Sequence, residues 1–121
     1  MPIGSETWPP DDGWHFREQE AAFLGRKFEI AGRQKDTLKV LAEARSRLTI
    51  QAIADGVSHD NQLGSKTIRG YLSEVRTLLR SAFIVDQSKD KNAPIISKGR
   101  GEEALWSLDL ESISVPAHFQ R

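Results

Sequence analysis

Basic side chains recur at helical spacing within residues 65–80, which read SKTIRGYLSEVRTLLR. At about 100° per residue, Ile68, Leu72 and Leu79 fall on one side of a helix, within about 40° of each other. Away from that apolar side, the helix would carry small residues at its centre and cations along its flank. A helix that enters a DNA major groove needs such a face, because small residues allow close approach and cations reach phosphates. The helix residues that we expect to contact DNA are Lys66, Thr67, Arg69, Gly70, Ser73, Arg76, Thr77 and Arg80.

A second basic motif is KGRG at residues 98–101. Lys98 and Arg100 stand next to glycines, which predicts a cationic β-turn at the tip of a hairpin. Taken alone, the basic side of the helix is explained by simple solvation. The basic turn favours DNA contact instead, provided that turn and helix are neighbours in the fold. The expected roles are base contact for Arg69, Ser73, Arg76 and Thr77, phosphate contact for Lys66 and Arg80, and hairpin anchoring for Lys98 and Arg100.

The sequence offers little for catalysis. His59 and Asp60 resemble a base with the group that orients it, but no serine, thiol or metal-ligand spacing completes them. The acidic pairs at 11–12 and 102–103 are adjacent residues whose side chains diverge, which is poor geometry for acid–base work. We therefore expect no catalytic residue, no metal site and no cofactor.

Composition indicates a globular protein with one core. The chain has 121 residues, of which 38% are apolar and 28% charged, and it contains no cysteine. Its net charge is zero, yet residues 31–80 hold nine basic and five acidic side chains, a local charge of +4. The sequence shows neither a secretory signal nor a run of apolar residues long enough to span a membrane. We expect a cytoplasmic location.

Apolar periodicity places the elements that must position the basic residues. The expected order is an acidic, proline-rich arm at 1–13, a small antiparallel sheet at 14–30, helices at about 33–44, at 50–57 and from 66 to about 80 or 82, a β-hairpin at 95–108, and a tail at 111–121. Thr49 and Ser65 are expected to cap the second and third helices. The fold class is therefore α+β. Three helices followed by a hairpin are typical of a winged helix-turn-helix domain, here at residues 14–110, with the hairpin as its wing.

The chain resembles the DNA-binding domain of OmpR/PhoB-type response regulators. The stretches that carry the resemblance, over about residues 14–108, are AAFLGRKFEIAGRQKDTLKVLAEA, LTIQAIADGV, KTIRGYLSEVRTLLR and IISKGRG. The resemblance implies a transcriptional regulator that binds double-stranded DNA, with helix 65–81 in the major groove and hairpin 95–108 beside it. Ser73 and Glu74 stand where that family often has two arginines, and Glu102 and Glu103 follow the basic turn. We expect no receiver domain, and therefore no control by phosphorylation of such a domain.

The alternative hypothesis is a winged-helix module that binds another protein and has little affinity for DNA. Zero net charge, Glu74 and the 102–103 acidic pair suit it. The arm and the tail would then contact the partner protein or a second copy of the chain, and no membrane is expected as a partner. For the DNA hypothesis, the decisive requirement is that the 98–101 turn lies beside Arg69 and Arg76.

Overall fold

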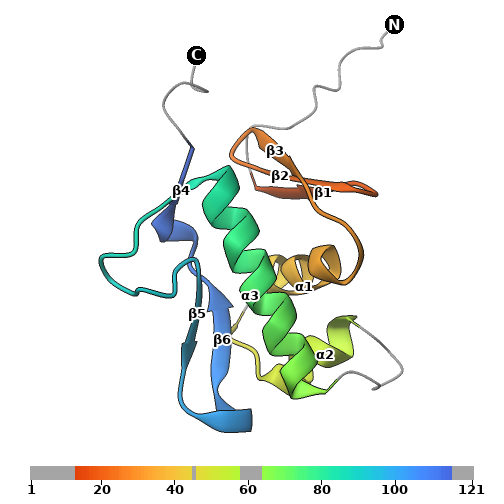
Figure 1. Ribbon diagram of the computed structural model, residues 1–121, viewed down its shortest axis with the longest axis vertical. Helices are drawn as coiled ribbons and strands as arrows, with labels where there is room; N and C mark the ends of the chain where they lie inside the picture. Colours follow the sequence, from red (N-terminus) through yellow and green to blue (C-terminus); the bar gives the residue numbers. More distant parts are fainter. Residues whose placement is uncertain (1–12, 45, 58–63, 116–121) are drawn as a thin grey trace, which may run out of the picture.

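The computed structural model describes residues 13–44, 46–57 and 64–115, which form an α+β fold (Figure 1). The helices are α1 (Gly32–Glu43), α2 (Ile50–Val57) and α3 (Ser65–Ala82), with short 3-10 turns η1 (Gly101–Glu103) and η2 (Leu110–Ser112). The strands are β1 (Trp14–Phe16), β2 (Glu20–Phe23), β3 (Arg26–Glu29), β4 (Ile84–Val85), β5 (Ile95–Lys98), β6 (Leu105–Leu108) and β7 (Ile113–Ser114). Nearly all of the predicted arm and the end of the predicted tail lie outside the described residues. None of the described helices is long and apolar enough to cross a membrane.

Strands β1, β2 and β3 form the antiparallel sheet predicted for residues 14–30. Leu24 and Gly25 make the two-residue turn between β2 and β3, and both have positive φ, 55° and 80°. Glycine adopts this backbone readily, whereas Leu24 adopts it at a steric cost. Phe23 packs edge-on against Phe83, the residue that follows α3, at a centroid distance of 6.1 Å. The sheet therefore covers the C-terminal end of α3.

The three predicted helices are confirmed, and their apolar sides meet in one core. Thr49 caps α2 as predicted, since its Oγ1 accepts a hydrogen bond from the Ala52 N–H at 3.1 Å. The predicted Ser65 cap is wrong by one residue. Gly64 occupies the cap position of α3, where its carbonyl accepts from the Ile68 N–H at 3.1 Å, and Ser65 is already the first helical residue. Buried side chains that α3 contributes to the core are Ile68, Leu72, Val75, Leu79 and Ala82.

The C-terminal part contains the predicted hairpin, in which β5 pairs with β6 antiparallel from Ile95–Leu108 to Lys98–Leu105. Leu48 adds a single bridge to this hairpin, exchanging two backbone hydrogen bonds with Trp106 at 2.8 and 2.6 Å. The packed structure also continues past residue 110, where the sequence predicts the tail. Strand β7 pairs with β4, and Ile113 is only 5% exposed because it closes the core beside α3.

Candidate nucleic-acid interface

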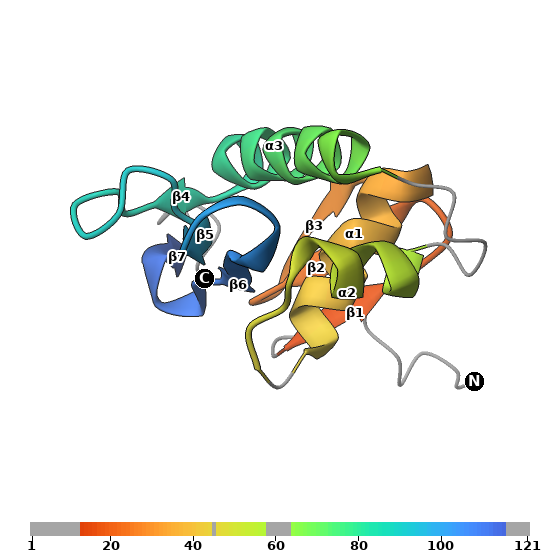
Figure 2. The same ribbon diagram turned by 90° about the horizontal axis from the view of Figure 1, so that it is seen from below.

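The outer side of α3 is a continuous exposed surface. Figure 2 shows α3 along one side of the molecule, with α1, α2 and the three-stranded sheet on its inner side. The exposed residues of this helix that were predicted to contact DNA are Lys66, Thr67, Arg69, Gly70, Ser73 and Thr77. We call Lys66, Gly70, Ser73 and Thr77 the outer face of α3. Its centre is made of small side chains, so that a rigid body can approach the helix axis closely.

The hairpin turn lies beside the start of α3, where it contacts Arg69; Arg76, farther along the helix, contacts Asn92 and the start of β5 instead of the turn. Arg69 Nη2 donates a hydrogen bond to the Gly101 carbonyl at 3.1 Å. Lys98 and Arg100 are both exposed in this turn. Gly99 has a φ of 99°, a region that strongly favours glycine, and a Cβ there would lie 3.3 Å from the Cα of Ala104. The basic turn therefore owes its tight shape to its glycines, and its backbone contacts the first turns of α3 through Gly101.

Arg76 and Arg80 are placed differently from the prediction. Arg76 donates from Nε to the Asn92 carbonyl at 2.7 Å and from Nη2 to the Ile95 carbonyl at 2.8 Å. Arg80 donates from Nε to the Ala93 carbonyl at 2.9 Å and from Nη2 to the Lys91 carbonyl at 2.6 Å. The base contact expected of Arg76 and the phosphate contact expected of Arg80 stay predictions, and each guanidinium group already gives two of its five donors to the protein's own backbone.

The electrostatics of Arg76 agree with this position. Burial lowers the pKa of the Arg76 guanidinium, the positive charge of Arg80 lowers it further, and Asp90 acts in the opposite direction. An arginine keeps its proton at any physiological pH, so the group remains a charged donor. Its burial shows that the guanidinium group is partly withdrawn from solvent.

Glu74 is turned toward α1 rather than toward the hairpin. Its Oε1 accepts a hydrogen bond from Nε2 of the half-buried Gln34 at 2.9 Å, although Glu74 itself is exposed. On the helix, Glu74 lies about 100° from Ser73, on the flank opposite the arginines. The carboxylate that suited the alternative hypothesis therefore stands at the border of the outer face.

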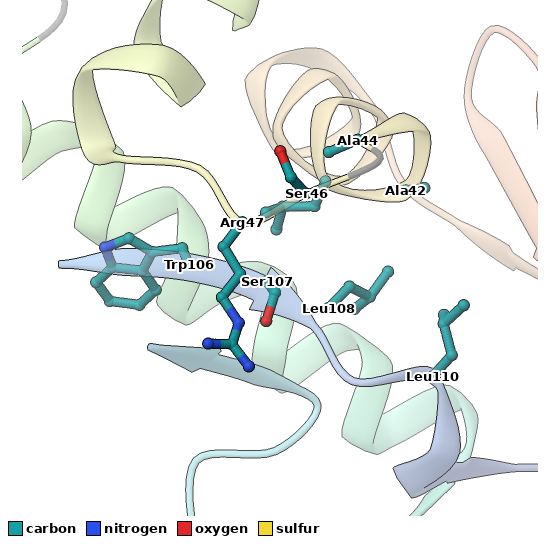
Figure 3. Close-up of a pocket in the computed structure, with 9 residues that line it drawn as sticks. Ala42, Ala44, Ser46, Arg47, Trp106, Ser107, Leu108 and Leu110 are labelled. Atoms are coloured by element: carbon teal, nitrogen blue, oxygen red, sulfur yellow. The ribbon is translucent and has the colours of Figure 1, made fainter. Parts of the chain in front are cut away.

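A cleft on a different part of the surface was not predicted from the sequence. It has a volume of about 350 Å³ and lies between the C-terminal end of α1, residues 46–47 and β6 (Figure 3). Its walls combine apolar side chains, including Trp106, Leu108 and Leu110, with the exposed Arg47. Leu110 is 47% exposed. No periodic pattern in the sequence indicates this site, because its lining comes from two segments about 60 residues apart.

Metal ligands are not gathered in the described part of the chain, where no group of three or more His, Asp or Glu side chains is placed to hold an ion.

Comparison of the chain with protein-family models, with curated proteins and with solved structures found no match. The geometry of the site therefore carries the functional argument.

Proposed function

We propose that this chain is a winged-helix DNA-binding domain of a transcriptional regulator. In this proposal α3 lies in the major groove of double-stranded DNA and the β5–β6 hairpin is the wing that contacts the adjacent backbone. The order of three helices and a hairpin, with Leu48 bridging to the hairpin, supports that assignment. The observation that carries it is the hydrogen bond between Arg69 and Gly101, which holds the basic turn against the first turns of α3, next to its outer face.

Gly70 adds a second, energetic argument. A glycine in an exposed helix interior costs about 1 kcal/mol relative to alanine. A Cβ added at Gly70 would have no atom within 4 Å, so nothing inside the described structure requires a glycine there. A duplex that approaches the helix closely at this point supplies the missing reason, since a groove wall would meet any larger side chain.

The proposed contacts follow from position and chemistry. Lys66, Lys98 and Arg100 hold phosphates, and Ser73 and Thr77 lie where they reach base edges. Arg69 keeps free N–H donors for the DNA after its single bond to Gly101. A surface of this size buries about 600–1,000 Å² on DNA, which calls for a second copy or a tethered partner to reach useful affinity. The compartment would be one that contains DNA, the cytoplasm in a cell without a nucleus.

The test is binding to random-sequence duplex DNA, measured by fluorescence anisotropy at several salt concentrations. We expect affinity to fall steeply with salt, because phosphate contacts release counterions. Lys66→Gln and Lys98→Gln should each reduce the slope of log K against log salt by about 0.9. Lys39→Gln removes the same charge from an exposed position on α1 and should leave the slope unchanged. Equal slopes in all three variants would contradict the proposal that Lys66 and Lys98 contact phosphates.

A protein-binding module remains the alternative function, and the cleft of Figure 3 is the observation that favours it. Its apolar wall and Arg47 fit a peptide with an apolar anchor next to an acidic residue. If the chain binds no DNA at any salt concentration, the protein-binding function replaces the DNA-binding function as our proposal. Retention of steep, salt-dependent DNA binding in Leu110→Asp would show that the cleft is not part of the DNA surface.

A further inference from the structure

Three arginines of α3 form a single row along the helix. Arg69, Arg76 and Arg80 are spaced by seven and four residues, which returns each to within about 40° of the others around the helix axis. We call them the arginine row. All three donate to backbone carbonyls of the segment that contains residues 91–101. The row thus faces the hairpin and the connection that leads into it.

That connection needs donors from outside. Between β4 and β5, residues 86–94 form a long connection that contains bends and a turn but neither helix nor strand. The carbonyls of the buried residues Ala93 and Ile95 require a hydrogen-bond partner and find it on Arg80 and Arg76, which also bind the carbonyls of the exposed residues Lys91 and Asn92. A guanidinium group presents five donors in a fixed fork, so that one arginine can hold two carbonyls at once. Lysine carries the same charge but cannot reproduce this geometry.

The bonds fix both ends of the hairpin relative to α3. Arg76 holds the carbonyl of Ile95, the first residue of β5, against the middle of the helix. Arg69 holds Gly101, at the tip, against the first turns of the helix. Contact with DNA through both α3 and the hairpin requires that their spacing be set in advance, because ordering a loose element on binding lowers affinity.

We propose that Arg76 and Arg80 are positioning residues, which seat the 91–95 segment on α3 and so set the spacing between α3 and the hairpin for DNA. The role of these residues in DNA recognition rests on the proposed function. Their hydrogen bonds to the 91–95 segment are present in the free protein and do not depend on that function. Neither residue contacts DNA in this arrangement, which separates them from Lys66 and Lys98.

The experiment uses Arg76→Lys and Arg80→Lys, which keep the charge and remove the fork. Amide hydrogen exchange at residues 90–98 should become about tenfold faster in each variant, while exchange in α1 stays as in the wild type. DNA affinity should fall severalfold with an unchanged salt slope, because no phosphate contact is lost. Arg100→Lys makes the same chemical change at the exposed hairpin tip and should leave exchange at residues 90–98 unaltered.

The outcomes separate the two proposals. Unchanged exchange at residues 90–98 in both lysine variants overturns the seating, whatever the DNA result. Faster exchange with wild-type DNA affinity overturns the link between seating and recognition. Retention of full affinity in Arg76→Lys together with a lower slope in Arg76→Gln identifies Arg76 as a phosphate contact instead. If the wild type binds no DNA while the lysine variants exchange faster, the proposed function fails and the seating stands.

Discussion

Helix α3 is held on two sides by contacts of different kinds. Toward α1 and α2 it buries Ile68, Leu72, Val75 and Leu79, none of which is more than 1% exposed. Toward the hairpin it makes directional hydrogen bonds from the arginine row to backbone carbonyls. Apolar burial is non-directional and supplies most of the folding free energy, whereas hydrogen bonds are small in net energy and specific in geometry. The apolar side therefore decides whether the domain folds, and the arginine side decides where the hairpin stands.

The largest effect should come from the apolar side. Leu72→Ala removes a fully buried side chain between the helices, and such changes cost about 2–5 kcal/mol of unfolding free energy. Urea unfolding monitored by circular dichroism measures this loss. The same substitution at Leu110, which is 47% exposed, should cost well under half as much. Similar losses in the two variants would contradict the assignment of Leu72 to the main core.

A smaller and more local effect is expected on the arginine side. Arg80→Ala removes two hydrogen bonds to carbonyls, at 2.9 and 2.6 Å, in a half-buried setting. We expect a loss of about 1–2 kcal/mol in unfolding free energy, measured in urea, because two hydrogen bonds are lost; the loss stays small because the freed carbonyls gain access to water. Arg100→Ala, at an exposed position in the hairpin turn, should change the unfolding free energy by less than about 0.5 kcal/mol. Equal losses would show that the carbonyl bonds do not stabilise the fold.

The apolar side was predictable from the sequence and the arginine side was not. The spacing of Ile68, Leu72 and Leu79 fixes one helix face, since burial follows the helical period whatever the partner is. The position of an arginine in the sequence does not reveal its partner, because the residue occupies the same flank of a helix whether it binds a phosphate or a carbonyl. The sequence feature that could have indicated the role of Arg76 and Arg80 is the connection at residues 86–94. It forms neither helix nor strand, so its backbone carbonyls find hydrogen-bond donors outside regular secondary structure.

The hairpin shows the same division. KGRG predicted a tight basic turn because Gly99 permits a backbone that other residues avoid. The pairing of β4 with β7 was not predicted, since two-residue strands leave no readable alternation. Ile113 lies in the segment predicted as a tail, and its burial ends the core. Short-range patterns thus gave the elements, and the long-range pairings had to come from the structure.

Gly70 offers a test in which stability and binding move in opposite directions. Gly70→Ala should raise the unfolding free energy by about 1 kcal/mol, since the helix gains propensity and the added Cβ meets no atom within 4 Å. Gly70→Leu should also stabilise the helix. DNA affinity, measured by anisotropy, should fall in the order Gly, Ala, Leu as the side chain fills the approach path. A stabilised Gly70→Leu variant with wild-type affinity would place the duplex away from the outer face of α3.

The smallest expected effect is at Glu74, on the flank of α3 opposite the arginine row. Glu74→Gln keeps a carbonyl oxygen for the hydrogen bond from Gln34 and removes only the negative charge. Because the carboxylate stands at the border of the outer face and is screened by salt, we expect DNA affinity to rise by only about twofold at low ionic strength. The gain should vanish at high salt, and stability should be unchanged. A tenfold gain would instead place Glu74 against a phosphate, and α3 would then enter the groove rotated toward α1 and away from the hairpin.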